Sequence, residues 1–239
     1  MAIATDHHHQ HRDINGGTAR AAVFGVSDGL LSNVSLILGV AGADPAPSVV
    51  RLAGLAGLVA GAFSMAVGEY LSVSAQVELT ERELRLERNE LRVRPAKELA
   101  ELVALYESRG VRADVAQEVA TALMADPEQA LEIHAREELG VDPNNLGSPV
   151  RAAAASFCAF VIGAFVPLIP WLAVNRTTGT AVLASIVLAA IGATTVGFIL
   201  ARFTGGKRWK AAARQVGLAA ISAAVAYAVG SLVGVTGAV

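Results

Sequence analysis

Five apolar segments, each long enough to cross a lipid bilayer, constrain this chain more than any other feature. They run over about 21–43, 49–73, 150–174, 180–203 and 211–234. A helix needs about 20 predominantly apolar residues to span the hydrocarbon core, and each segment is near that length. Composition agrees, because 54% of the residues are hydrophobic, only 17% are charged and the mean hydropathy is +0.50. The sequence therefore predicts an all-α membrane protein with five transmembrane helices per subunit.

A polar leader, residues 1–20, precedes the first apolar segment. That segment is too long for the core of a signal peptide, lacks a clear cleavage site and follows a leader that is not short and basic, so it is interpreted as a span. The leader is interpreted as disordered, with metal collection by its histidines as the alternative. These histidines are His7, His8, His9 and His11.

Basic residues are unevenly distributed among the connections between spans. The connection between the fourth and fifth spans is the most basic, with Arg202, Lys207, Arg208, Lys210 and Arg214. Cytoplasmic loops carry the excess of Lys and Arg. We therefore expect an inner-membrane, multi-pass protein of a bacterium-like cell, with the N-terminus and residues 74–148 in the cytoplasm and the C-terminus outside.

Residues 74–148, between the second and third spans, have a different composition. Sixteen acidic and nine basic residues lie between positions 73 and 149, a net charge of −7. Helical sequence continues to Val93, before Pro95, and further helices are expected at about 95–108, 112–124 and 127–139. The predicted organisation is a leader (1–20), two spans (21–73), a cytoplasmic acidic helical domain (74–148) and three spans (149–239).

One carboxylate, Asp28, lies inside the first apolar segment. A charge at membrane depth is costly and is by default a hypothesis about ion or proton movement. In the other apolar segments Lys and Arg stand only near the ends, so none lies in a segment interior to neutralise Asp28. Met65 lies at a similar depth in the second span, about 12 Å from its cytoplasmic end, so the two residues are candidates for one site. A thioether beside a carboxylate favours a transition metal, whereas plain packing is the alternative for Met65.

Acidic side chains in the 74–148 region recur at helical spacing. Glu83, Glu87 and Glu90 fall at i, i+4 and i+7, Glu98 and Glu101 at i, i+3, and His134 and Glu138 at i, i+4. Carboxylates with an imidazole suit Fe²⁺, Mn²⁺ or Zn²⁺. The alternative is a set of solvated helix faces, balanced by interleaved arginines.

Two motifs carry a resemblance to a known family. They are Val26-Ser-Asp-Gly-Leu-Leu31 in the first span and the segment 63–76, FSMAVGEYLSVSAQ. With the acidic insert that closes on Glu138-Leu-Gly140, and with Val166-Pro-Leu-Ile-Pro170, the chain resembles the vacuolar iron transporter family from Arg20 onward.

The resemblance implies a dimer of five-span subunits that moves Fe²⁺, and often Mn²⁺, out of the cytoplasm in exchange for protons. It also implies a membrane site at Asp28 and Met65. A cytoplasmic metal-binding domain is implied as well, with ligands at Glu87, Glu90, Glu98, Glu101 and Glu138. Two departures are His134, where some plant members have methionine, and Gly57, where some eukaryotic members carry an acid.

The resulting hypothesis is a homodimeric metal/proton antiporter, not an enzyme, that exports Fe²⁺, with Mn²⁺ or Zn²⁺ as further candidates. It has no cofactor and no nucleic-acid partner. Metal collected by the acidic domain, with His134 contributing, passes the cytoplasmic mouth near Glu69 and exchanges for a proton at Asp28. The main alternative is a membrane-anchored metal sensor or store, for which Asp28 has no use. A di-iron enzyme is the weaker alternative, because paired E-x-x-H motifs are lacking.

Overall fold

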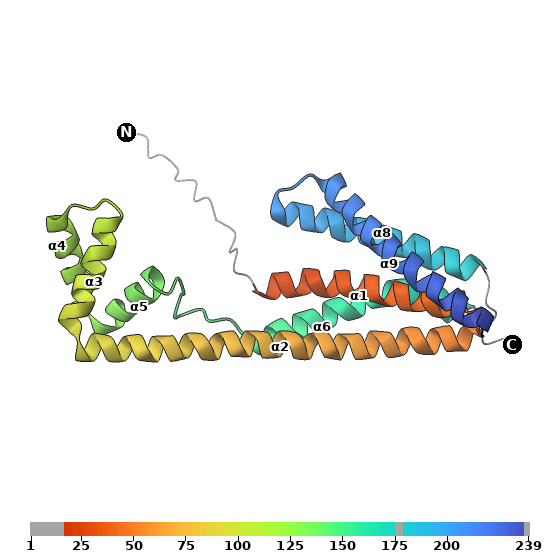
Figure 1. Ribbon diagram of the computed structural model, residues 1–239, viewed down its shortest axis with the longest axis horizontal. Helices are drawn as coiled ribbons and strands as arrows, with labels where there is room; N and C mark the ends of the chain where they lie inside the picture. Colours follow the sequence, from red (N-terminus) through yellow and green to blue (C-terminus); the bar gives the residue numbers. More distant parts are fainter. Residues whose placement is uncertain (1–16, 175–178, 237–239) are drawn as a thin grey trace, which may run out of the picture. The chain divides into compact units, whose positions relative to one another are not determined.

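The computed structural model describes residues 17–174 and 179–236, and every regular element in those ranges is helical (Figure 1). The leader histidines lie outside the described residues. The elements are α1 (Gly17–Gly42), α2 (Pro47–Val93), α3 (Pro95–Ser108), α4 (Ala113–Leu123), α5 (Pro127–Glu137), α6 (Pro149–Phe165), η1 (Val166–Leu168), α7 (Ile169–Ala173), α8 (Gly179–Thr204) and α9 (Arg208–Thr236). The prediction of an all-α protein is confirmed.

Five helical stretches in the described residues are long and apolar enough to cross a membrane. They are Arg20–Gly42, Pro47–Val93, Pro149–Ala173, Gly179–Thr204 and Arg208–Gly234. Each contains most of one predicted span, so the number and positions of the spans agree with the sequence. Two of the expected helices of the acidic region, 112–124 and 127–139, are one or two residues longer at an end than the observed α4 and α5.

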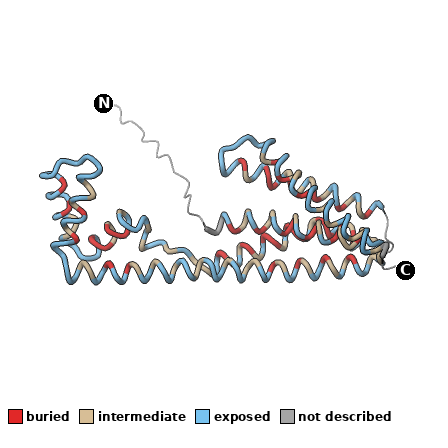
Figure 2. Tube along the Cα trace, in the orientation of Figure 1, coloured by how far each residue is buried: buried red, intermediate tan, exposed pale blue. Residues whose placement is uncertain are grey.

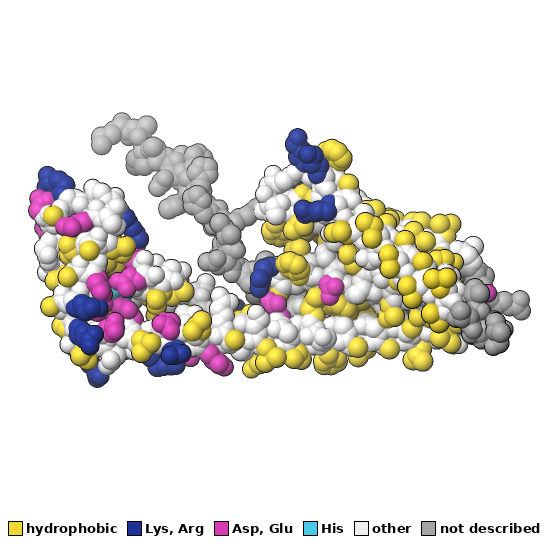
Figure 3. Space-filling view, viewed as in Figure 1, with side chains coloured by type: hydrophobic (Ala, Val, Ile, Leu, Met, Phe, Trp, Pro, Cys, Tyr) yellow, Lys and Arg dark blue, Asp and Glu magenta, His cyan; other side chains and the backbone are white. Residues whose placement is uncertain are grey.

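The chain divides into two compact units that differ in chemistry. One, here called the apolar unit, comprises residues 1–70 and 150–239, and the other, the acidic unit, comprises residues 71–149. Charged side chains gather over the acidic unit, whereas hydrophobic side chains dominate the visible face of the apolar unit (Figure 3). Helix α2 contributes its first half to the apolar unit and its second half to the acidic unit.

Helix α1 is the central helix of the apolar unit. It packs against α9, α8 and η1, and much of it is buried (Figure 2). Leu30, Val34 and Leu38 of α1 form a core cluster with Ala189 and Ala193 of α8. A functional group on α1 is therefore held by a helix with neighbours on several sides.

Glycines bring the backbones of α1 and α6 into contact. A Cβ atom added to Gly29 would collide with the carbonyl oxygen of Phe160, and one added to Gly163 would collide with that of Val26. Small residues permit this close approach between membrane helices. The helix turn that carries Asp28 is thus positioned directly against α6.

Two prolines, Pro167 and Pro170, interrupt the third span. Helix α6 ends at Phe165, and Pro167 lies in the single 3₁₀ turn that separates it from α7. Proline lacks an N–H group and cannot continue the hydrogen-bond pattern of an α-helix. The Trp171 side chain donates to Ser185 Oγ (2.9 Å), and Ser185 Oγ donates to the carbonyl oxygen of Pro167 (2.8 Å). These two buried bonds tie the interrupted span to α8.

The acidic unit contains the second half of α2 together with α3, α4 and α5. Pro95 and Pro127 stand at the first turns of α3 and α5, where a missing N–H costs nothing. Asp126 caps α5 by accepting from the backbone N–H groups of Glu128 and Gln129. Leu84 of α2 packs against Leu131 and Ala135 of α5. This packing brings the acidic faces of α2 and α5 toward each other.

Candidate functional site

A cavity of about 260 Å³ in the apolar unit contains both candidate membrane ligands. Asp28 from α1 and Met65 from α2 line it, and polar groups of Ser32, Asn33 and Ser64 share its wall. Leu36, Gly57, Gly61 and Phe160 complete the lining. The inference of equal depth drawn from residue counts is therefore matched by one shared cavity. Carboxylate, thioether and neutral oxygen donors are thus assembled in one place.

Asp28 is exposed on the single chain, whereas Met65 is half-buried. The Met65 side chain also packs against Leu58, Ala62 and Phe160, so packing and cavity lining are combined in one residue. Ser32 Oγ donates to the backbone carbonyl oxygen of Asp28. The residues that line the cavity with Asp28 include no Lys, Arg or His.

Glu69 lies one helical turn beyond Met65 on α2. Its carboxylate forms an ion pair with Arg20 of α1, with an Nη2–Oε1 distance of 3.6 Å. The Glu69 side chain is mostly buried, the Arg20 side chain mostly exposed, and Glu69 Oε1 has no hydrogen-bond partner among the described residues. Spacing alone did not predict that the candidate mouth residue has a cationic partner.

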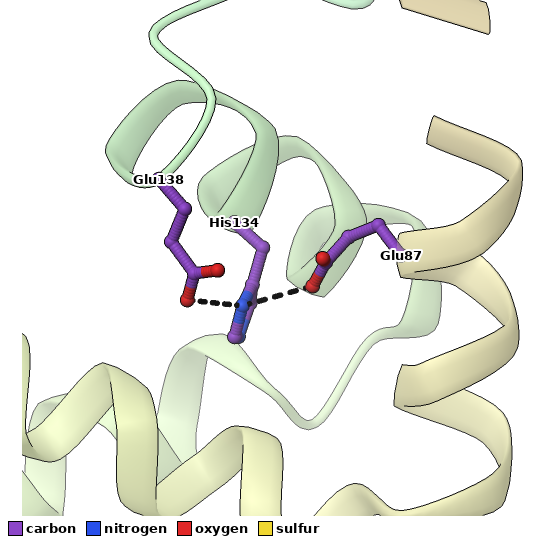
Figure 4. Close-up of side chains that lie close together, drawn as sticks. All are labelled: Glu87, His134 and Glu138. Atoms are coloured by element: carbon purple, nitrogen blue, oxygen red, sulfur yellow. Dashed lines mark hydrogen bonds and ion pairs between the residues drawn. The ribbon is translucent and has the colours of Figure 1, made fainter. Parts of the chain in front are cut away.

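The acidic unit brings together donors from three helices. His134 Nδ1 of α5 lies 3.1 Å from Glu87 Oε1 of α2 and 3.1 Å from Glu138 Oε1, at the end of α5 (Figure 4). The predicted i, i+4 contact between His134 and Glu138 is present. Glu87 also belongs to a second group of mutually close carboxylates, with Glu90 and Glu98, whose donor atoms lie within 4.8 Å of one another. Glu87 thus links two sets of potential ligands.

Burial distinguishes this cluster from a solvated helix face. The exposed fractions are 0% for His134, 1% for Glu98 and 9% for Glu87. Glu98 Oε1 and His134 Nε2 are buried without a hydrogen-bond partner among the described residues, and the buried Glu87 Oε1 has the contact with His134 Nδ1, which is an ion pair only when the imidazole is protonated. Such atoms are costly unless a ligand or a proton satisfies them. The donor set and these unsatisfied atoms fit a divalent transition cation.

Burial raises the pKa of Glu87, and the nearby carboxylates of Glu138, Glu98 and Glu90 raise it further, whereas His134 opposes the shift. Burial and the carboxylate of Glu101 likewise raise the pKa of Glu98. Both effects disfavour the charged carboxylate. These two groups therefore hold protons more readily than ordinary glutamates until a cation replaces the protons.

Glu101 differs from the other candidate ligands. It lies outside both convergent groups and is paired with Lys97, whose Nζ is 2.8 Å from Glu101 Oε1 and 3.7 Å from Glu98 Oε1. The hydrogen bond from Lys97 lowers the pKa of Glu101. Sequence reasoning missed Lys97, although its i, i+4 spacing to Glu101 was a usable signal.

The fold and these two donor sets define a multi-pass helical membrane protein with a polar cavity in its apolar unit and a buried carboxylate–imidazole cluster in its acidic unit. Comparison with known proteins gives the family. The VIT family model matches residues 19–231, and on that match the chain belongs to the VIT family.

Individual relatives agree with this assignment. A vacuolar iron transporter of Acanthamoeba castellanii is 38% identical over 185 residues, which cover 74% of this chain and 67% of the relative. Vacuolar iron transporter 1 of Arabidopsis thaliana is 32% identical over 183 residues, which cover 77% of this chain and 73% of the relative. Vacuolar iron transporter homolog 4 of Oryza sativa subsp. japonica is 59% identical over 69 residues, which cover 28% of this chain and 32% of the relative.

Proposed function

We propose that this chain transports Fe²⁺, with Mn²⁺ as a second substrate, out of the cytoplasm in exchange for protons. The observation that carries the proposal is the shared cavity of Asp28 and Met65 within the apolar unit. A carboxylate binds either a proton or a cation, and a thioether favours transition metals over Mg²⁺ and Ca²⁺. The printed names of the relatives, vacuolar iron transporters, support iron as the substrate.

The acidic unit collects metal on the cytoplasmic side in this proposal. Its buried donors on Glu87, Glu98 and His134 support a binding role. The basic residues Lys207, Arg208, Lys210 and Arg214, at the end of α8 and the start of α9, support the orientation, because such residues favour the cytoplasmic face. Metal then reaches the cavity past Glu69, whose carboxylate exchanges Arg20 for the arriving cation.

The proposed protein is a homodimer. Asp28 is exposed on the single chain at membrane depth, where a carboxylate facing hydrocarbon is costly. A second copy that covers this face would remove the Asp28 carboxylate from lipid. The covering surface would also enclose the exposed, cavity-lining Leu36 and Ser64.

The experiment that tests the proposal measures Fe²⁺ uptake and internal pH together in proteoliposomes. In the wild type, we expect metal flux in one direction and proton flux in the other. Asp28→Asn should abolish both, because an amide does not exchange a proton for a divalent cation, while the protein stays folded and dimeric. Asp44→Asn, which removes an acid outside the cavity, is the matched control and should retain flux. Proton-coupled transport by Asp28→Asn would refute the membrane site.

A membrane-anchored sensor or store remains the second candidate, favoured by the buried cluster in the acidic unit. Metal binding without any flux by wild-type protein in the same proteoliposomes would support that function instead.

A further inference from the structure

Asn33 is a buried amide in the wall of the cavity that holds Asp28 and Met65. Its exposed fraction is 2%, and it lies on α1, five residues after Asp28. An amide carries donors at one end and an acceptor at the other, and both ends need partners when they are removed from water. The two ends of Asn33 have different surroundings.

The donor end of Asn33 is satisfied. Asn33 Nδ2 lies 2.6 Å from the backbone carbonyl oxygen of Ala164. Because a carbonyl oxygen only accepts, the amide nitrogen must face it. Ala164 lies in the last turn of α6, where carbonyl groups lack a continuing helix to bind them. This bond satisfies the Ala164 carbonyl at the end of α6 and fixes the orientation of the Asn33 side chain.

The acceptor end of Asn33 is not satisfied. Asn33 Oδ1 is buried and has no hydrogen-bond partner among the described residues. A Cβ atom added to Gly57 would collide with Leu36 Cδ2 and lie 3.1 Å from Asn33 Oδ1, so these two side chains pack against the glycine. Asn33, Leu36 and Gly57 all line the cavity. The unsatisfied oxygen therefore belongs to a side chain in the cavity wall.

Helix packing accounts for the bonded nitrogen of Asn33 but not for its unbonded oxygen. The bond to Ala164 links α1 to α6 through the nitrogen, and a serine or threonine hydroxyl would supply such a donor without leaving a second atom unsatisfied. An unpaired buried acceptor destabilises the folded protein unless something binds it. A cation bound at Asp28 and Met65 is a partner of the required chemistry, because amide carbonyl oxygens are cation ligands.

We infer that Asn33 Oδ1 is a ligand of the transported cation, alongside the Asp28 carboxylate and the Met65 sulfur. This inference rests on the proposed transport function of the cavity. The amide oxygen is neutral and does not titrate, so Asp28 alone exchanges protons while Asn33 contributes to cation binding. A hard oxygen donor also offsets the preference of the Met65 sulfur for soft ions. It thereby extends the range of cations that the site binds to include Fe²⁺ and Mn²⁺.

The test uses full-length protein in proteoliposomes and measures the KM for Fe²⁺ and the inhibition constant of Cd²⁺ as a softer competitor. Asn33→Leu has a similar volume but no oxygen. We expect its KM for Fe²⁺ to rise about tenfold, as for the loss of one supporting ligand, and the inhibition constant of Cd²⁺ to change much less. Ser35→Ala is the matched control, since Ser35 lies on the same helix, bonds only to Leu31 O and does not line the cavity.

Asn33→Asp separates ligation from helix packing. Aspartate keeps a carboxylate oxygen but, like leucine, has no donor for the Ala164 carbonyl, so the two variants lose the same helix contact and differ in the ligand oxygen. This variant should therefore retain the wild-type KM for Fe²⁺ or lower it. If Asn33→Leu and Asn33→Asp raise the Fe²⁺ KM and the Cd²⁺ inhibition constant equally, the side chain acts in packing and the inference is wrong. The inference is also wrong if Asn33→Leu has the wild-type KM. Failure of the proposed function is recognised separately, by proton-coupled transport in Asp28→Asn.

Discussion

In the proposed transport function, single side chains would set the metal preference of the cavity. Asp28 and Asn33 offer oxygen, and Met65 is the sulfur donor in the lining. Sulfur discriminates against hard cations, whereas oxygen binds them readily. We therefore expect the balance among these three residues to determine which divalent ions the proposed site accepts.

Met65→Leu tests the part of that balance that depends on sulfur. The substitution nearly conserves volume, and hence the packing of Met65 on Phe160, but removes the thioether. We expect transport to persist with weaker discrimination between Fe²⁺ and Mg²⁺, measured by competition of Mg²⁺ against Fe²⁺ uptake. An unchanged ratio would mean that Met65 acts in packing alone.

We expect Lys97 to compete with metal for the carboxylates of the acidic cluster. Its ammonium group lies beside the carboxylates of Glu98 and Glu101. Lys97→Gln should therefore raise the affinity of the acidic unit for Mn²⁺, by about threefold because the pair is exposed and screened. Calorimetry of the full-length protein measures this affinity.

Arg85→Gln is the matched control for that experiment, because Arg85 pairs with Glu81 outside the cluster. It should leave Mn²⁺ affinity unchanged. Equal effects of the two variants would point to the net charge of the unit rather than to the position of Lys97.

Helices are the scale at which the sequence was most informative. Segment length and the positions of Pro95, Pro127 and Pro149 predicted helix bounds to within a few residues, because proline and apolar length act locally. Spacing also predicted the contact between His134 and Glu138, which share one helix face.

Contacts between helices were harder to predict from the sequence. No spacing rule predicts that Glu87 of α2 faces His134 of α5, and the resemblance to a family supplied that grouping. Spacing does not show whether Asn33 acts in packing or in ligation, because the direction of its oxygen depends on Ala164, 131 residues away. Such roles depend on how helices cross, which residue patterns within one helix do not encode.

Helices α3 and α5 should become more stable in the metal-free protein as the pH falls below neutral. Glu87 and Glu98 have raised pKa values in the folded state, so their contribution to stability is present at low pH and is lost as the pH rises through those pKa values. Glu101 acts in the opposite direction, but it is exposed and contributes little.

Hydrogen exchange of full-length protein, corrected for the intrinsic effect of pH on exchange rates, measures this stability helix by helix. Saturating Mn²⁺ should restore protection of α3 and α5 at pH 7.5, since metal replaces the protons. Loss of protection on acidification of the metal-free protein would contradict the assigned cause of the pKa shifts.

At the scale of the whole molecule, we propose a collecting site and a transporting site on one chain. Glu98→Gln together with Glu101→Gln should weaken Fe²⁺ uptake at limiting metal but leave substantial uptake at saturating metal, because Asp28 and its cavity are unchanged. Initial uptake rates in proteoliposomes over a range of Fe²⁺ concentrations measure this difference. A uniform loss of rate at every concentration would show that the acidic unit is required for transport itself.

The glycine contact between α1 and α6 has a consequence for motion. Because Gly29 and Gly163 bring main chain against main chain, no change of rotamer can loosen this contact. The Asn33 bond to Ala164 reinforces it. We expect α1 and α6 to travel as one rigid body during alternating access, so that opening and closing of the cavity falls to the neighbouring turns of α2, where Met65 moves relative to Asp28.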